Sequence, residues 1–142
     1  YDGSTKDTLN NIRDTKEFVV NLVSEEIVEP MVACATDYGK EVDEFKISNL
    51  TPINSEKISP PRLKESKVSY ECELHSIVDI GNAEPGAGFV VIGTIVMFHI
   101  ADDVYKDGRV DLKALNPIGR LAGNNYTRVF DNFKVIRKIK PD

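Results

Sequence analysis

An alternation of apolar and polar residues between positions 68 and 80 constrains the fold of this chain more than any other feature. The apolar positions are Val68, Tyr70, Cys72, Leu74, Val78 and Ile80. The polar positions between them are Ser69, Glu71, Glu73, His75 and Asp79. A period of two residues predicts a β-strand with one face on the core and one polar face. On the polar face, Glu71 and Glu73 are either a carboxylate pair or ordinary solvated side chains.

The segment 89–100, which reads FVVIGTIVMFHI, is apolar at both sets of alternating positions. It follows a turn-rich connection over 81–88, so an antiparallel hairpin is expected. In an antiparallel protein, a strand buried on both faces has the interior of a barrel on one side and a helix or another subunit on the other. We therefore expect a β-barrel that forms a dimer.

The remaining patterns predict a mostly β chain with short helices, folded as one domain over residues 1–142. Ser4 or Thr5 is expected to cap the first helix, and Pro30 is expected to kink or split the second. The first helix should cover 6–13, the second 24–35 and a single helical turn 111–115. The other expected strands are 17–23 and a last strand at 128–139 that ends in a basic tail.

Charge and cysteine content exclude several classes of function. The net charge of −5 lacks the basic footprint of a general nucleic-acid binder, so no nucleic-acid partner is expected. The longest apolar run is too short to span a bilayer and no signal segment opens the chain, so no membrane partner and a cytoplasmic location are expected. Cys34 and Cys72 are far apart, which predicts buried free thiols and neither a disulfide framework nor a metal site.

The start of the first helix is one candidate binding site, because hydroxyl groups, an ammonium group and free N–H groups converge there. Its residues are Ser4, Thr5, Lys6, Asp7 and Thr8. This chemistry can hold a phosphate, although a capped helix with a solvated lysine has the same sequence pattern.

The loop 119–126 is the second candidate, since Arg120 can grip an anion and Tyr126 can stack on a ring. An ordinary turn with a surface arginine is the alternative. His75 and His99 are expected to be structural, because neither belongs to a known hydrolase or metal motif. No catalytic residue is identified.

Several segments together resemble the flavin reductase-like, FMN-binding split-barrel family, and most closely its branch that contains flavoredoxin. The first is DGSTKDTLNNIRDTKEFVVN at 2–21, similar to the family pattern DGS.KDT..NI..T.EFVVN. Later matches include Leu50-Thr51-Pro52, Pro60-Pro61-Arg62, Tyr70-Glu71-Cys72, Val91-Ile92-Gly93 and the segment RLAGNNY at 120–126. The resemblance covers nearly the whole chain.

The resemblance implies a homodimer of antiparallel split barrels that holds FMN near the subunit interface, with NADH or NADPH as electron donor. It places Lys6, Asp7 and Thr8 at the FMN phosphate, with Ser4 as a weaker contact. Arg120 and Tyr126 are implied to lie close to the flavin. The implied activity is that of an FMN-dependent oxidoreductase, in which the flavin performs the transfer and no acid–base triad is needed. A flavin-dependent enzyme is the implied partner.

Two departures from the family pattern keep other functions open. Gly86-Ala87-Gly88 stands where many flavin reductases have Gly-Asp-His, whose histidine is associated with nicotinamide binding. The family's upstream strands have no counterpart before Tyr1, so the domain is expected to be incomplete at its N-terminus. The alternatives are therefore a non-enzymatic FMN-binding electron carrier and a dimeric domain with a decayed flavin site.

Overall fold

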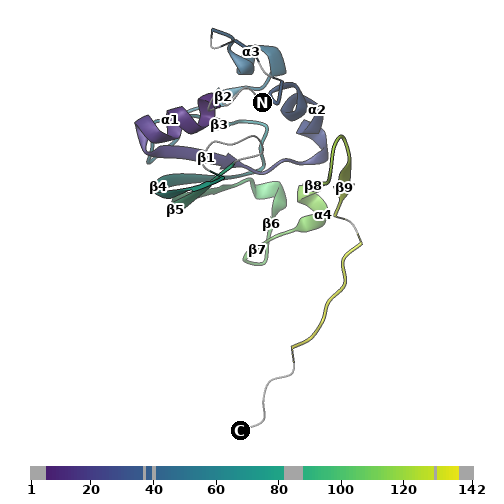
Figure 1. The fold of residues 1–142 in the computed structure, drawn as a ribbon. Helices are drawn as coiled ribbons and strands as arrows, with labels where there is room; N and C mark the ends of the chain where they lie inside the picture. Colours follow the sequence, from purple (N-terminus) through teal and green to yellow (C-terminus); the bar gives the residue numbers. More distant parts are fainter. Residues whose placement is uncertain (1–5, 37, 40, 82–87, 130, 138–142) are drawn as a thin grey trace.

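The computed structural model describes residues 6–36, 38–39, 41–81, 88–129 and 131–137 (Figure 1). The strands are β1 (Glu17–Asn21), β2 (Pro52–Ile53), β3 (Arg62–Leu63), β4 (Val68–Ile80), β5 (Gly88–Ile100), β6 (Tyr105–Lys106), β7 (Arg109–Val110), β8 (Ile118–Arg120) and β9 (Tyr126–Arg128). The helices are α1 (Asp7–Thr15), α2 (Val28–Ala33), α3 (Glu44–Ser48) and α4 (Leu112–Leu115), with short 3-10 helices η1 (Glu25–Ile27) and η2 (Asp102–Val104). The prediction of a mostly β chain with short helices is confirmed.

A three-stranded antiparallel sheet in the order β1-β4-β5 forms the centre of the molecule. Glu17 pairs with Glu73 at one end of β1, and Ile80 pairs with Gly88 at the far end of the long β4–β5 hairpin. Three further antiparallel pairs, β2–β3, β6–β7 and β8–β9, are separate from this sheet. Within the described residues the central sheet is open, so the expected closed barrel is not formed by this part of the chain.

Helix α1 lies over the central sheet and turns directly into β1 (Figure 1). Leu9 and Ile12 are buried because they are three residues apart and share the face toward the sheet. The helix ends at Lys16, which has a left-handed backbone (φ 62°) and donates its N–H to the carbonyl of Ile12. This end sets the direction in which β1 leaves the helix.

The best-buried apolar cluster lies at the opposite end of the sheet and consists of Val68, Val104 and Leu115. It is surrounded by half-buried Leu22, Tyr70, Ile100, Ala101 and Val110. The predicted turn over 111–115 is confirmed as α4, whose start is capped by the Asp111 carboxylate. That carboxylate accepts the N–H groups of Lys113 and Ala114 at 2.9 and 3.2 Å. The cap orients α4 so that Leu115 closes the cluster.

The predicted helix 24–35 is split, as the proline suggested, but the break lies before Pro30. The segment forms η1 and then α2, in which Pro30 is the third residue. In the first turn of a helix the N–H group has no intrahelical partner, so the proline removes no bond there. Ser24 occupies the capping position of η1, yet its side chain makes no capping bond and its Oγ is buried without a hydrogen-bond partner.

The predicted last strand at 128–139 is wrong over the part that the structure describes. Arg128 ends β9, and residues 129 and 131–137 have no regular secondary structure. This segment leads away from the body of the molecule (Figure 1). A strand needs a neighbouring edge for its backbone hydrogen bonds, and β-propensity alone does not supply one.

Candidate functional site

Helix α1 begins where the sequence predicted a phosphate site. Lys6 has an extended backbone (φ −61°, ψ 146°), and its carbonyl accepts the N–H groups of Leu9 and Asn10 at 3.0 and 3.3 Å. Lys6 is therefore the capping residue, whereas Ser4 and Thr5 lie outside the described residues. The first N–H groups of a helix have no intrahelical acceptor, and they place a partial positive charge at this end.

A cavity of about 270 Å³ opens at this helix start, and we call it the Lys6 cavity. Its lining residues are Lys6, Thr8, Leu9, Ile12, Gly88, Phe89 and Val91. Lys6 and Thr8 provide an ammonium group and a hydroxyl, while α1 and the beginning of β5 provide an apolar wall. Asp7 is exposed and is not among the lining residues. The cavity thus combines a cationic, hydrogen-bonding end with an apolar surface.

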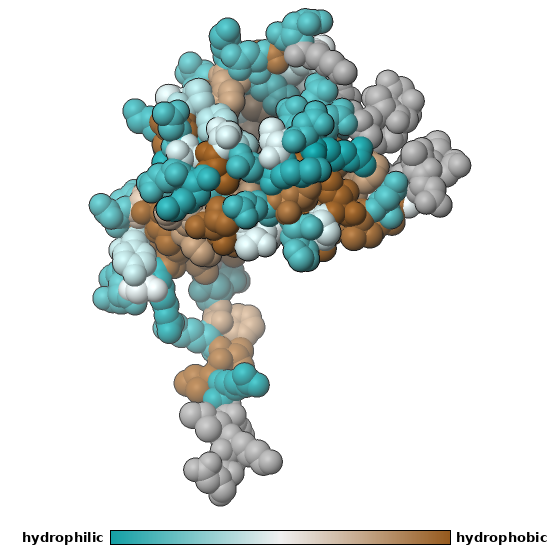
Figure 2. All heavy atoms as spheres, turned by 90° about the vertical axis from the view of Figure 1, so that its left-hand side faces the viewer, coloured by the Kyte–Doolittle hydropathy of each residue, from teal (hydrophilic) through white to brown (hydrophobic). Residues whose placement is uncertain are grey.

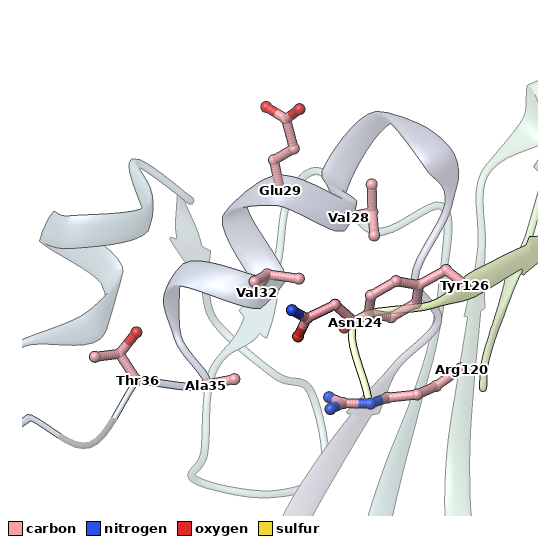
Figure 3. A pocket seen from close by; sticks show the side chains of 8 residues that line it. All are labelled: Val28, Glu29, Val32, Ala35, Thr36, Arg120, Asn124 and Tyr126. Atoms are coloured by element: carbon pink, nitrogen blue, oxygen red, sulfur yellow. The ribbon is translucent and has the colours of Figure 1, made fainter. Parts of the chain in front are cut away.

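A larger cavity of about 560 Å³ lies between α2 and the β8–β9 hairpin, and we call it the Arg120 cavity (Figure 3). Its lining residues are Val28, Glu29, Val32, Ala35, Thr36, Arg120, Asn124 and Tyr126. The Arg120 guanidinium lies 5.6 Å from the centre of the Tyr126 ring, which allows a cation–π contact. A volume of this size is within the usual range for ligand pockets.

The tight turn between β8 and β9 brings Arg120 and Tyr126 together. The two residues face each other directly in the strand register. Gly123 has a left-handed backbone (φ 62°), which a residue with a side chain rarely adopts, and its carbonyl accepts a bond from Arg120 Nη2 at 3.3 Å. The structure therefore places Arg120 and Tyr126 side by side, and their role in binding stays a prediction.

Glu25 fastens this hairpin to the rest of the protein. Its carboxylate accepts bonds from both Nε and Nη2 of Arg128, with the Nε bond at 2.7 Å, and from Asn116 Nδ2 at 3.1 Å. Hydrogen bonds from Arg128 and Asn116 lower the pKa of Glu25 from 4.5 to about 2. The carboxylate is therefore charged at neutral pH and holds β9 beside η1, which leads into the cavity wall formed by α2.

The structure divides the predicted binding residues between two cavities that share no lining residue. Lys6 and Thr8 belong to the first, and Arg120 and Tyr126 belong to the second. Asp7 lines neither cavity, and the prediction for Ser4 falls outside the described residues. These assignments to a flavin remain predictions.

A buried polar cluster around Glu71 was missed by the sequence reasoning. Glu71 Oε1 lies 2.5 Å from His99 Nε2 and accepts the N–H of Glu56 at 2.8 Å, while Oε2 accepts the N–H of Lys57 at 2.7 Å. Arg62 Nε lies 3.7 Å from the same carboxylate. The cluster holds the loop before β3 against the central sheet.

Glu71 therefore corrects the prediction of a solvated polar face on β4. Its side chain is completely buried, whereas Glu73 is exposed, so the two do not form a carboxylate pair. Burial raises the pKa of Glu71, but hydrogen bonds from the Glu56 and Lys57 backbones and from His99 outweigh it and lower the pKa. No local pattern in the sequence pairs positions 71 and 99, and the tertiary fold alone reveals the cluster.

The two cysteines are free thiols, and Cys72 is buried while Cys34 is half-buried. Burial raises the pKa of the Cys72 thiol, which disfavours a reactive thiolate. Within the described part of the chain, His, Cys, Asp and Glu side chains form no group of three or more that could hold a metal ion. None of the helices described in the structure is long and apolar enough to cross a membrane.

Comparison with known proteins identifies a sequence family. A model of the flavin reductase like domain matches residues 3–115. An uncharacterized protein of Halalkalibacterium halodurans is 38% identical over 138 residues, which are 96% of this chain and 66% of the relative. The chain thus spans about two thirds of the length of that relative.

Solved structures show the same fold. Nitrilotriacetate monooxygenase component B from Bacillus cereus matches with a TM-score of 0.87 and 35% identity, over 95% of this chain and 67% of the other. A Shewanella frigidimarina protein described as a flavin reductase with a split barrel domain matches with a TM-score of 0.81 and 26% identity, over 92% and 65%. Flavoredoxin of Desulfovibrio vulgaris matches with a TM-score of 0.80 over 93% and 68%, and its 19% identity shows a likeness of fold alone. The chain therefore belongs to the flavin reductase-like domain family.

Proposed function

We propose that this protein is an FMN-binding oxidoreductase, which passes electrons from NADH or NADPH to flavin or from bound FMN to an acceptor. The observation that carries the proposal is the Lys6 cavity, where a lysine and a threonine at a helix start meet an apolar wall. Membership of the flavin reductase-like family supports flavin as the ligand. Because the chain spans only about two thirds of its relative, the proposal concerns the activity of the whole protein.

The chemistry of the Lys6 cavity fits a molecule that combines a phosphate with an apolar ring system. The Lys6 ammonium, the Thr8 hydroxyl and the positive end of α1 are all suited to a phosphate dianion. Asp7 would contribute through its backbone N–H, since its carboxylate repels a phosphate. Ser4 is proposed as a further hydroxyl donor, on the basis of the family pattern.

The Arg120 cavity is proposed as the second region of flavin contact. The guanidinium of Arg120 can pair with an anionic or carbonyl oxygen, and the ring of Tyr126 can stack on a planar group. Val28 and Val32 of α2 lie on the opposite side of this cavity (Figure 3). An apolar wall facing a cation and an aromatic ring suits a ligand that is both flat and polar at its edges.

Bound FMN supplies the hydride or electron transfer that the proposed activity requires. The residues of the chain have simpler tasks: Lys6 and Thr8 bind, while Arg120 and Tyr126 orient. The proposed reaction needs no catalytic acid or base from the protein. Glu71 is not required for one, because its buried carboxylate is already held by the N–H groups of Glu56 and Lys57 and by His99.

A non-enzymatic FMN-binding electron carrier is the second candidate. It is favoured by Gly86-Ala87-Gly88, which replaces the histidine-containing segment of many flavin reductases. Gly86 and Ala87 lie outside the described residues, and a Cβ added at Gly88 would meet no atom within 4 Å. A dimeric domain with a decayed flavin site is the third candidate.

Spectroscopy and turnover of the purified full chain separate these candidates. We expect a visible flavin spectrum after addition of FMN and oxidation of NADH or NADPH above the rate of free FMN. Bound flavin without such turnover would indicate the carrier. A colourless protein whose thermal stability FMN does not raise would indicate the decayed site, because a ligand of the native state must stabilise it.

The binding residues are tested by titration of FMN into Lys6→Ala and Thr8→Ala. Loss of a charge-assisted hydrogen bond should weaken FMN affinity about tenfold or more in Lys6→Ala, with a smaller loss in Thr8→Ala. Lys46→Ala is the matched control, since Lys46 lies on the surface of α3 with its side chain 84% exposed. Equal affinities of Lys6→Ala and the control would show that Lys6 does not bind the phosphate.

The family resemblance also supports a homodimer, a flavin-dependent partner enzyme and a cytoplasmic location. We include these in the proposal. The mass of the protein in solution tests the homodimer directly.

A further inference from the structure

The β8–β9 hairpin carries Arg120 and Tyr126 and is separate from the central sheet. In the described part of the chain its two strands pair only with each other. A two-stranded hairpin is marginally stable in water by itself, so contacts outside the hairpin have to fix its orientation. The placement of Arg120 and Tyr126 therefore depends on how the hairpin is anchored.

Backbone bonds anchor the beginning of β8. Ile118 donates its N–H to the carbonyl of Val23 at 3.2 Å, and Glu25 donates its N–H to the carbonyl of Asn116 at 3.1 Å. These bonds hold the start of the hairpin beside η1. Strand β9 takes no part in them, so it needs an anchor of its own.

An ion pair provides that anchor. Beyond the hairpin itself, the hydrogen bonds described for β9 are those that Arg128 donates through Nε and Nη2 to one carboxylate oxygen of Glu25, with the Nε bond at 2.7 Å. The other carboxylate oxygen accepts a bond from Asn116 Nδ2 at 3.1 Å. In Figure 2 the segment that follows β9 extends below the body of the molecule. Arg128 thus holds the strand at the point where the chain leaves the body.

The Glu25 carboxylate is a fixed acceptor, because the buried core holds its surroundings. Asn116 directly follows Leu115 of the core cluster, and Ile27, two residues after Glu25, is buried as well. The Arg128 side chain is by contrast 62% exposed. An exposed ion pair contributes little to the stability of a fold, but two bonds from one guanidinium restrict its direction. The pair therefore orients β9 more than it stabilises the protein.

The ion pair joins the two walls of the Arg120 cavity. Arg128 and Tyr126 are two residues apart on β9, so their side chains leave the strand on the same face. Tyr126 faces Arg120 in the strand register. On the side of Glu25, η1 continues into α2, whose Val28 and Val32 lie across the cavity from Tyr126 (Figure 3). Both walls thus start from one pair of charges.

We propose that Arg128 and Glu25 are positioning residues for the flavin, because their ion pair fixes the β8–β9 hairpin opposite α2. Neither residue lines the cavity, so both act through Arg120 and Tyr126. Without the pair these two side chains remain but their strand is loose, and binding then has to order the hairpin, which lowers affinity. The inference rests on the proposed function, in which Arg120 and Tyr126 contact the flavin.

FMN titration of the full chain with Arg128→Ala measures this role. We expect the dissociation constant for FMN to rise about fivefold. Arg128→Lys keeps the charge but loses the planar fork, so its affinity should lie between those of Arg128→Ala and the natural protein. Arg109→Ala, on exposed β7, is the matched control and should bind FMN like the natural protein.

A double-mutant cycle separates positioning from a general effect on the fold. In the Thr8→Ala protein, whose change lies in the Lys6 cavity, Arg128→Ala should weaken FMN binding by the same factor as in the natural protein. In a protein with Arg120→Ala and Tyr126→Ala, it should weaken binding by less than about twofold, because the side chains through which the pair acts are gone.

Two further measurements guard against a variant that simply misfolds. Glu25→Arg and Arg128→Glu should each weaken FMN binding, and the two together should restore part of it, since the Asn116 carboxamide can pair with either charge. Hydrogen exchange without FMN should become faster at 118–128 in Arg128→Ala and stay unchanged at 68–80 in the central sheet.

The outcomes are distinct. The positioning role is overturned if Arg128→Ala leaves FMN affinity unchanged in the natural protein, or weakens it equally in both backgrounds of the cycle. Unchanged hydrogen exchange at 118–128 overturns it as well. FMN binding that is lost in Lys6→Ala but insensitive to Arg128→Ala overturns this inference alone. If the natural protein binds no FMN, the proposed function fails and the inference fails with it.

Discussion

Glu71 on β4 and His99 on β5 meet inside the protein, with Oε1 and Nε2 separated by 2.5 Å although the residues are 28 positions apart. The same carboxylate accepts two backbone N–H groups from the loop at Glu56 and Lys57. One buried side chain thus joins two neighbouring strands to a loop that has no regular secondary structure of its own.

Replacement of Glu71 by glutamine should destabilise the fold. An amide has one acceptor oxygen, so its NH2 group would face one of the two backbone N–H groups and leave it unsatisfied. We expect the free energy of unfolding to fall by about 2–3 kcal/mol in Glu71→Gln, measured by urea denaturation. Glu73→Gln, on the exposed side of the same strand, is the control and should change it little. A stability equal to that of the control would mean that the cluster does not hold the loop.

The contacts of Glu25 predict how acid acts on the β8–β9 hairpin. The pKa of Glu25 is about 2 in the folded protein, below its ordinary value of 4.5. The stabilising contribution is therefore complete above pH 4.5 and is lost as the pH falls toward 2. Thermal melts should show Glu25→Gln less stable than the natural protein at pH 6, with the difference shrinking below pH 4.5. Glu26→Gln, which leaves the Arg128 contact intact, should not reproduce this pattern.

Gly93 is predicted to be intolerant of a side chain because the ring of Phe18, on β1, reaches across β4 and lies against Gly93 on β5. A Cβ at Gly93 would overlap the end of the Phe18 ring and lie 3.2 Å from Cys72 Cβ. Gly93→Ala should lower the free energy of unfolding by about 1–3 kcal/mol through overpacking. Gly39→Ala, where a Cβ meets no atom within 4 Å, is the control. If Phe18→Leu restores part of the stability that Gly93→Ala loses, the contact with the Phe18 ring causes the loss. If the losses of the two substitutions add in the double variant, another cause is responsible.

If Arg120 contacts the flavin as proposed, a substitution that keeps its positive charge should still weaken FMN binding. Arg120→Lys retains a cation but loses the planar fork and its stacking on Tyr126. FMN affinity measured by fluorescence titration should fall by about tenfold. Arg109→Lys, on exposed β7, should bind FMN like the natural protein. If Arg120→Lys bound FMN with unaltered affinity, the flavin would not contact the Arg120 cavity.

Local patterns predicted much of the candidate site and the elements that carry it. The alternation over 68–80 identified β4, the spacing of Leu9 and Ile12 identified α1, and Asp111 marked the start of α4. Each of these signals depends on neighbours within a few residues, so the sequence reports it directly. The clustering of Lys6 with Thr8, and of Arg120 with Tyr126, is local in the same sense.

The predictions for Glu71 and for the segment 128–139 were wrong, because residues far away in the sequence decide burial and strand pairing there. Glu71 stands at a polar position of the alternating pattern over 68–80, where a solvated side chain is expected, but the loop at Glu56 and Lys57 and the ring of His99 bury it. The segment 128–139 has the composition of a strand, but after Arg128 no described strand pairs with its described residues, 129 and 131–137.

The sequence by itself determined the long β4–β5 hairpin and the helices α1 and α4, because periodicity and capping act over single turns and strands. Only the tertiary structure decided that Lys6 and Arg120 line separate cavities and that Glu71 is buried. Those outcomes depend on contacts between residues far apart in the chain, and burial and hydrogen bonding there outweigh local preference.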